Sequence, residues 1–518
     1  MPETSRRIEE ELLRRTNLLR IYIAVIIACL ATAAARADHG RIIRNPNPVA
    51  NRYIVVFKDS ATNRPNVQAL AHELAAKHGA TIPKNHQGEE LLQWTVQGFV
   101  AIMPDTAATA IANDPRVDFV EQDAYASVSR SLSVNMNGDY RLWSLDRLDG
   151  GRAVWDGSTY WGDRAYNYQT DGTGVYIYMI DTGVDRSHSE FSNGKVLDGV
   201  QFADDQYSAT APCGPGAIRD ERNSVVPHGT GTASVAGGVN VGVASGAYIV
   251  PIKITACNGV SYVSWLCLGM DWIVSPNNPW RYDYYGNPTP GVVSCSTFYD
   301  AQTWTYPLVT DIGPGAFGQA IQDVIRGCPL AQAPCQPNQR GLAVIASANN
   351  QGQADRACSQ WPAQLSYNGL IDPNTGTYQV GYPDLRVITV GGTDEQDRIW
   401  NCLNSGDCVV TSTNPLTYDQ NAMGSNYGKC VDIYAPAHNI QAAAMRGSTS
   451  YRYSILDSPP PPLNTNSGTS FSAPYVAGIA ARILQSSPTL TPAQLWAVIQ
   501  STAQNGNGFL IAHMWPWD

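Results

Sequence analysis

The chain is 518 residues long, which is enough for two or three domains. Hydrophobic residues make up 43% of it, with 45 Gly and 33 Pro, a composition that is typical of a loop-rich globular protein and excludes a disordered or fibrous one. Only 15% of the residues are charged and the formal net charge is −10, so no stripe of Lys and Arg is available to neutralise phosphates. We therefore expect no nucleic-acid partner.

The first 37 residues have the features of a secretory signal peptide. Arginines between Arg6 and Arg20 precede the apolar run Ile21–Ala35, and Ala35-Arg36-Ala37 supplies a cleavage signal of small residues. The run is shorter than the ~18 residues expected of a membrane span. The sequence therefore predicts a secreted protein. The alternative is a membrane-tethered protein with an uncleaved signal anchor.

Cysteine usage agrees with export. Only Cys29 of the 11 cysteines precedes residue 140, and the other ten suit disulfides formed in an oxidising compartment. No C-x-x-C pair occurs, so we expect no zinc or redox site. Short separations favour the local pairs Cys328–Cys335 and Cys402–Cys408, and the spacing leaves the other pairings open.

Residues 51–123 predict a small α+β domain in which strand-like and helix-like runs alternate. The block has no cysteine and no convergent acid–base groups. Its expected elements are strand 53–58, helix 67–78, strand 98–103, helix 106–112 and strand 117–122. The polar stretch Ala126–Asn137 follows, and we interpret it as an exposed linker of the kind that proteases cut.

From Leu142 onward the pattern changes to apolar strands that alternate with helices. This pattern predicts an α/β fold with a parallel sheet covered on both faces. The expected elements are strands 175–180, 247–253, 291–294, 342–346 and 387–390, with helices at 263–273 and 316–325.

Three short stretches carry the residues of greatest chemical interest. In IDTGVD, Asp181 ends an apolar strand, and active sites of open parallel sheets gather at such strand ends. In HGTGTASVAG, His228 precedes small residues that can pack as a tight helix. In SGTSFSAPYVAG, a Gly-rich entry puts Ser470 in the first turn of a helix, where unpaired N–H groups and the helix dipole favour a developing anion.

Each stretch taken alone has a structural alternative: Asp181 as a strand cap, His228 as a packed histidine and Ser470 as an N-cap. Together they follow a known chain order of the Ser-His-Asp triad. The three stretches resemble the signature motifs of the subtilisin family, and most closely those of its proteinase K branch. Val387–Gly391 and Ser425–Pro436 are similar to the framework of that family as well.

The resemblance implies a fold class and a domain plan. The fold is α/β, a subtilisin-like three-layer arrangement with a mainly parallel sheet, preceded by a small α+β domain similar to the family's inhibitor-type propeptide. The plan is a signal peptide over 1–37, a propeptide over 38–130 and a peptidase domain over 131–518. The propeptide is expected to act as an intramolecular inhibitor and folding aid until the protein cuts its own linker.

The resemblance also implies a reaction. Ser470 attacks the peptide carbonyl, His228 takes its proton and returns it to the leaving amine, and Asp181 orients the imidazole. Asn349 matches the family's side-chain donor to the oxyanion, beside the Ser470 N–H. The family has Gly before this asparagine where this chain has Ala348, so Asn350 is the alternative one residue further on.

Substrate-lining positions also follow from the resemblance: Ser294, Ser296, Ala346, Ser347 and Ala348. The family's Ser-Leu-Gly-Gly segment is replaced by Ser294–Tyr299, which ends in two aromatic residues. Aromatic rings at positions that are usually Gly are expected to reshape the subsites for the substrate.

A structural calcium ion is a further expectation, held by Asp432 and the carbonyls of Leu385 and Val387 in accordance with the oxygen-ligand preference of this ion. The alternative is that Asp432 is an ordinary turn carboxylate. No cofactor is expected for the chemistry itself. We expect protein or peptide substrates, the chain's own propeptide as a partner, and a monomer.

The resulting hypothesis is a secreted serine endopeptidase that is made as an autoprocessed zymogen. The alternative is a catalytically impaired protein that keeps the subtilisin fold for binding or regulation. The presence of Asp181, His228 and Ser470 favours the enzyme. The segment Ser294–Tyr299, which differs from the family's Ser-Leu-Gly-Gly segment, is the feature that favours the alternative.

Overall fold

The computed structural model of the chain describes residues 41–45, 47–62, 64–85, 87–128, 132–136, 143–149, 166, 168–191, 194–203, 228–256, 259–300, 315–328, 335, 339–366, 386–401, 424–443, 463–506 and 508–514. The expected signal peptide, the Cys402–Cys408 pair and Leu385 lie outside these ranges. Among the described residues, no helix is both long and apolar enough to cross a membrane.

The N-terminal unit, residues 41–128, has the expected α+β fold. Its elements are β1 (Arg41–Ile43), β2 (Pro48–Phe57), α2 (Val67–His78), β3 (Lys84–Asn85), β4 (Gly88–Glu89), β5 (Leu91–Leu92), β6 (Gly98–Ile102), α3 (Asp105–Ala112) and β7 (Val117–Val128). β2 lies between β6 and β7 and is antiparallel to both. Alternate β2 residues, Tyr53 and Val55, pack with Leu74 and Ile111 of the two helices, whereas Ile54 and Val56 belong to a different core cluster, because successive side chains of a strand point to opposite faces.

The larger sheet, as far as it is described, has nine strands in the order β10-β11-β9-β13-β15-β17-β18-β21-β20. The strands are β9 (Tyr176–Asp181), β10 (Val200–Gln201), β11 (Tyr248–Lys253), β13 (Gly291–Cys295), β15 (Ala343–Ser347), β17 (Ile388–Thr393), β18 (Ile433–Pro436), β20 (Gln504–Gly506) and β21 (Phe509–Ile511). Only β20 runs antiparallel to its neighbour. The expected parallel sheet and its expected strands are thus confirmed.

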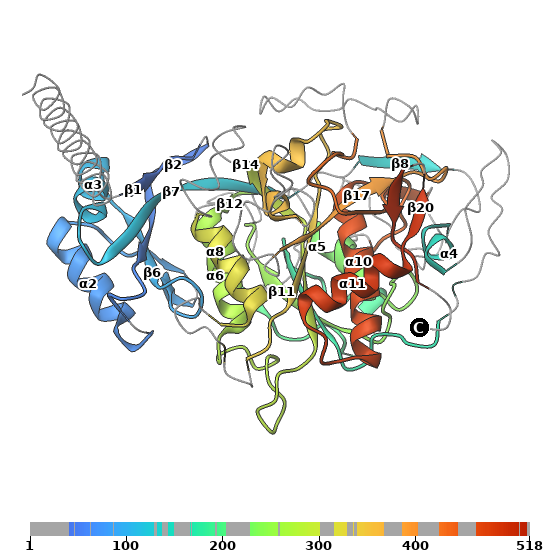
Figure 1. Cartoon of the computed structure of the whole chain (residues 1–518), viewed down its shortest axis with the longest axis horizontal. Coiled ribbons are helices and arrows are strands. Elements are labelled where there is room, and N and C mark those ends of the chain that lie inside the picture. The colour runs from blue at the N-terminus through green and yellow to red at the C-terminus, as the bar shows by residue number, and fades with distance from the viewer. Residues whose placement is uncertain are drawn as a thin grey trace, which may run out of the picture.

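Helices cover both faces of this sheet. They are α5 (Gly229–Gly237), α6 (Val263–Val274), α8 (Ala316–Arg326), α10 (Thr469–Ser486) and α11 (Pro492–Thr502), with α4 (Trp143–Asp149) at the side of α10. Ile177 and Met179 of β9 pack with α5, α10 and α11, whereas Tyr178 and Ile180 pack with α6 and α8. The α/β three-layer fold is therefore confirmed. In Figure 1, α6 and α8 stand between the blue N-terminal unit and the sheet.

The described parts of Ala126–Asn137, which were interpreted as an exposed linker, form two paired strands, and Ala126 is buried. β7 continues to Val128, with Ala126 buried, and Leu132–Met136 forms β8, which pairs antiparallel with β19 (Leu463–Ser467). The backbone partners of both strands come from parts of the chain that are remote in sequence. A local pattern of polar residues therefore gave no sign of them.

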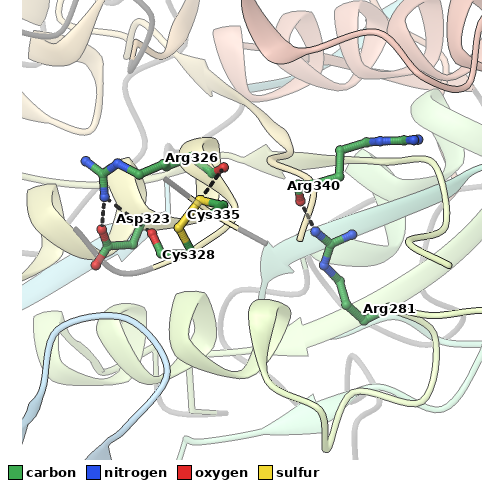
Figure 2. Close-up of a disulfide and its surroundings, with 6 residues drawn as sticks. All are labelled: Arg281, Asp323, Arg326, Cys328, Cys335 and Arg340. Carbon is green, nitrogen blue, oxygen red and sulfur yellow. Dashed lines mark hydrogen bonds and ion pairs between the residues drawn. A yellow bond between two sulfur atoms is a disulfide. The ribbon is translucent and has the colours of Figure 1, made fainter. Parts of the chain in front are cut away.

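Two disulfides link described cysteines. Cys328–Cys335, as expected, follows the end of α8, where Arg326 pairs with Asp323 one turn earlier (Figure 2). Cys358–Cys430 joins segments that are 72 residues apart. Cys267 and Cys295 are buried and free.

Candidate active site

Asp181 and His228 meet at the carboxyl end of the parallel sheet. Asp181 is the last residue of β9, and His228 immediately precedes α5. The imidazole Nδ1 lies 2.8 Å from Oδ1 and 2.9 Å from Oδ2 of the carboxylate. Both side chains are buried, at 0% and 1% exposure, so the pair is shielded from water.

Small residues allow this close approach of α5 to the end of β9. A Cβ on Gly229 would lie 2.1 Å from the carbonyl oxygen of Gly183, so only glycine fits directly after His228. The Thr182 hydroxyl accepts hydrogen bonds from the backbone N–H groups of His228, at 3.1 Å, and Gly229, at 2.8 Å. The start of the helix is thereby tied to the strand that carries Asp181.

The Asp181 carboxylate receives two further hydrogen bonds. The Thr182 N–H donates to Oδ1 at 2.7 Å, and the Thr232 hydroxyl donates to Oδ2 at 3.1 Å. Burial opposes ionisation, but the electrostatic interaction and hydrogen bond with His228, together with these donors, outweigh it, so the pKa of Asp181 lies below its ordinary value. Neither threonine was identified from sequence, because hydrogen bonds of a backbone N–H or of a hydroxyl have no sequence signature of their own.

Ser470 lies in the first turn of α10. The helix begins at Thr469, after the N-cap residue Gly468, whose φ is 155°. The neighbouring Phe471 ring lies 6.1 Å from the His228 ring, centroid to centroid. The start of α10 therefore adjoins the imidazole. The Nε2 atom of His228 is buried and makes no hydrogen bond within the part of the chain that is described.

The two adjacent asparagines have different surroundings. Asn349 has a left-handed backbone, with φ of 76°, and its side-chain amide donates to Oε1 of Gln360 at 3.2 Å. Asn350 faces α10, where its Oδ1 accepts from both N and Oγ1 of Thr469, each at 2.9 Å. The asparagine side chain that contacts the residue next to Ser470 is thus that of Asn350. Asn349 occupies the left-handed position, which Gly or Asn tolerates best.

The end of β7 lies beside these residues as an added strand. It pairs antiparallel with β12 (Ser261–Tyr262) through Tyr125 and Ala126, and with β14 (Thr297–Asp300) through Ser127 and Val128. Beyond residues 129–131, β8 begins with Leu132 opposite Ser467. The N-terminal unit therefore ends on β14, next to Ser296, and the next described strand lies against Ser467, three residues before Ser470.

The residues expected to line the substrate are all buried. Ser294 lies in β13, Ala346 and Ser347 lie in β15, and Ala348 follows that strand. Ser296, between β13 and β14, donates its hydroxyl to the Ser470 carbonyl at 3.0 Å. The Tyr299 ring stacks on Trp361 of β16 (Gln360–Trp361), which is one consequence of the aromatic residues in this segment.

Cys295 lies near Asp181 but is a weak candidate for a nucleophile. Burial raises the pKa of its thiol to about 12. The thiolate, which is the reactive form, is therefore scarce at neutral pH. Ser470, in the first turn of the helix whose Phe471 ring lies beside the buried histidine, remains the candidate nucleophile.

Asp432 and Val387 are the described residues of the expected calcium site. Oδ2 of Asp432 accepts from the Thr389 N–H at 2.8 Å, so one carboxylate oxygen is used within the fold. Val387 is buried, at the junction with β17. No group of three His, Cys, Asp or Glu residues suited to a metal occurs among the described residues.

Comparison with known sequences gives a consistent result. Residues 172–514 match the Subtilase family. The chain is 28% identical over 461 residues to the alkaline serine exoprotease A of Vibrio alginolyticus, a match that covers 88% of this chain and 65% of that protein. It is also 28% identical over 463 residues to an extracellular serine proteinase of Thermus sp. (strain Rt41A), covering 87% of this chain and 84% of the relative.

Fungal and structural relatives agree with these matches. The subtilisin-like serine protease Pen ch 13.0101 of Penicillium rubens is 26% identical over 474 residues, covering 89% of each chain. Among solved structures, that of fervidolysin from Fervidobacterium pennivorans, a keratinolytic enzyme related to subtilisin, has a TM-score of 0.55 and 16% identity, covering 92% of this chain and 62% of the other. At that identity it supports the fold alone. The family match, the relatives and the fold together show that the chain belongs to the subtilase family.

Proposed function

We propose that the protein is a secreted serine endopeptidase whose triad is Asp181, His228 and Ser470. The observation that carries this proposal is the buried hydrogen bond between His228 Nδ1 and Asp181, directly beside the first turn of α10, which contains Ser470. The names of the relatives, as serine proteinases, support the same reaction. Two described disulfides and the extracellular relative support export.

The chemistry follows from these groups. Asp181 holds the Nδ1–H of His228, which leaves the Nε2 lone pair to take the proton from Ser470 as its oxygen attacks the peptide carbonyl. The resulting imidazolium is stabilised by the carboxylate and returns the proton to the leaving amine. The acyl-enzyme is then cleaved by water in a second round of the same proton transfers.

The tetrahedral oxyanion needs donors outside the triad. The Ser470 backbone N–H, at the first turn of α10, is one. We propose Asn350, in preference to Asn349, as the side-chain donor. The bonds from Thr469 to Oδ1 fix the Asn350 amide plane next to Ser470, whereas the Asn349 amide donates to Gln360.

We also propose that residues 38–130 are the inhibitory propeptide. Their last described residues already lie as a strand on β12 and β14, which is the arrangement expected of a bound peptide. The strands that flank residues 129–131 end opposite Thr297, next to Ser296, and opposite Ser467, three residues before Ser470, so we propose that the processing bond lies between Val128 and Leu132.

Carboxylates of the N-terminal unit support this docking by capping two helices of the peptidase part. Asp123 accepts from the Ser264 N–H at the start of α6, at 3.0 Å. Glu121 accepts from the Ala316 N–H at the start of α8, at 2.6 Å. Negative charge at a helix N-terminus is stabilised by the unpaired N–H groups and the helix dipole.

Processing tests the proposal. The wild-type chain is expected to shorten by a cut between Val128 and Leu132, whereas Ser470→Ala stays full length, because the cut is made by the chain's own triad. Intact-mass and N-terminal analysis of both proteins, purified from a protease-deficient host, measures this. Adding a trace of wild-type enzyme to Ser470→Ala is the control that the bond is accessible. Normal processing of Ser470→Ala alone would refute autoprocessing.

The affinity of the separated propeptide is expected to fall as the pH rises. Asp271 of α6 accepts backbone hydrogen bonds from Gln93, Trp94 and Thr95 of the N-terminal unit, and burial raises its pKa to about 6. Removal of the propeptide returns this carboxylate to water, where its pKa is lower. A proton therefore favours the complex: the extra affinity is complete well below pH 4 and is lost as the pH passes 6.

The raised pKa of Asp271 is expected to lower the affinity of the propeptide for the enzyme about tenfold between pH 5 and pH 7. Burial also raises the pKa of Glu90 and Glu121 at the same interface, which adds to the effect in the same direction. Inhibition of the processed enzyme by its own propeptide, titrated across this range, measures the slope. Asp271→Asn keeps an acceptor without the titration, so it should flatten the slope; an unchanged slope contradicts the role given to Asp271.

A further inference from the structure

A proline interrupts the hydrogen bonding of the helix that carries Ser470. In a regular α-helix the carbonyl of each residue accepts from the N–H four residues later. For Ser470 that residue is Pro474, which lies inside α10 and has no N–H. The Ser470 carbonyl is therefore deprived of its regular helical donor at the residue that performs the attack.

The hydroxyl of Ser296 supplies a donor to this carbonyl. It lies 3.0 Å from the Ser470 carbonyl oxygen, and the two residues are 1% and 0% exposed, so water does not compete for the bond. Ser296 and Ser470 are 174 residues apart in the chain. The bond thus joins the first turn of α10 to a different layer of the fold.

The position of Ser296 between two strands explains why its hydrogen bond to Ser470 matters. Ser296 connects β13, a central strand of the large sheet, to β14, the strand on which β7 lies like a bound peptide. Ser296 therefore directly precedes β14, which would align a bound peptide, and it also hydrogen-bonds to the backbone of Ser470, the proposed nucleophile. A shift of α10 relative to β14 would move the Ser470 oxygen away from the carbonyl it attacks.

We propose that Ser296 is a positioning residue, which replaces the N–H that Pro474 lacks and holds Ser470 in register with the bound substrate. This proposal rests on the proposed function, since it assigns a role in the same reaction. It differs from the expectation that Ser296 merely lines the substrate. A lining role would affect substrate affinity, whereas a positioning role affects the rate of the chemical step.

Ser296→Ala in the processed enzyme is expected to lower kcat about tenfold with little change in KM, because a buried carbonyl loses its donor at the reacting residue. Ser472→Ala is the matched control. Ser472 is two residues after Ser470, and its buried hydroxyl lies 3.1 Å from the carbonyls of Ala435 and Pro436. This control removes the same kind of bond from the same turn, and we expect its kcat to stay close to that of the wild type. Melting temperatures of both variants show whether either effect is one of folding.

Pro474→Ala provides the decisive comparison, since alanine restores an N–H that can donate to the Ser470 carbonyl. In this background Ser296→Ala should cost less than about twofold in kcat. An equal loss in both backgrounds, a rise in KM at constant kcat, or an equal loss in Ser472→Ala would overturn the role of Ser296. If the wild type shows no hydrolysis that Ser470→Ala abolishes, the proposed function fails together with this inference, so the two failures are distinguishable.

Discussion

Ser470→Ala is expected to reduce peptide hydrolysis by roughly 10⁴- to 10⁶-fold in kcat, because a triad acts as a unit and the loss of its nucleophile removes the covalent pathway. KM should change little, since the backbone partners on β12 and β14 are untouched. The residual rate over water would come from the oxyanion donors and from binding alone. Steady-state hydrolysis of a chromogenic peptide by processed protein measures both constants.

His228→Ala provides the matched comparison. It removes the base and also leaves the Asp181 carboxylate without its partner, so its kcat should fall to a similar level. The double variant should be no worse than either single one. Losses that multiply in the double variant would mean that the two residues act independently, which contradicts the triad.

Asn350→Ala is expected to lower kcat by roughly 10²- to 10³-fold with KM nearly unchanged, because an oxyanion donor contributes mainly in the transition state. The side chain also accepts from Thr469, so part of the loss reflects poorer placement of Ser470. Asn350→Asp keeps that acceptor but replaces the donor with an anion. It should therefore be at least as impaired as the alanine variant.

Asn349→Ala, one residue earlier, is the control in the same loop. Its side chain contacts Gln360 and its backbone has φ of 76°, so alanine costs stability through the strained backbone and the lost bond. Its kcat should fall much less than that of Asn350→Ala. The reverse order of the two variants would assign the oxyanion donor to Asn349, the residue that the sequence resemblance favours.

The sheet and its helices were predictable because their strands are continuous apolar runs. Strands such as β9 and β15 are buried on both faces, so they show as short hydrophobic segments that end in turn residues. The helices α6 and α8 were predicted as helix-like runs between these strands. β7 was found only in part, because its last residues hydrogen-bond to β12 and β14, more than 130 residues away.

The candidate triad was predictable because three motifs in a fixed order carry it. The residues that support the candidate triad could not be predicted from sequence. Thr232 and Ser296 act through single hydroxyls on partners distant in the chain, and no local pattern marks such bonds. The proposal of Asn350 over Asn349 depends on side-chain hydrogen bonds, from Thr469 to Asn350 and from Asn349 to Gln360, which the sequence does not show.

Covalent labelling tests the central claim most directly. A serine-directed fluorophosphonate, added to the processed enzyme and followed by peptide mapping, should give one adduct, on Ser470, in step with the loss of activity. His228→Ala should label far more slowly, since the attacking hydroxyl then lacks its base. An adduct on another residue, or complete inactivation without modification of Ser470, would contradict the assignment of Asp181, His228 and Ser470 as the catalytic triad.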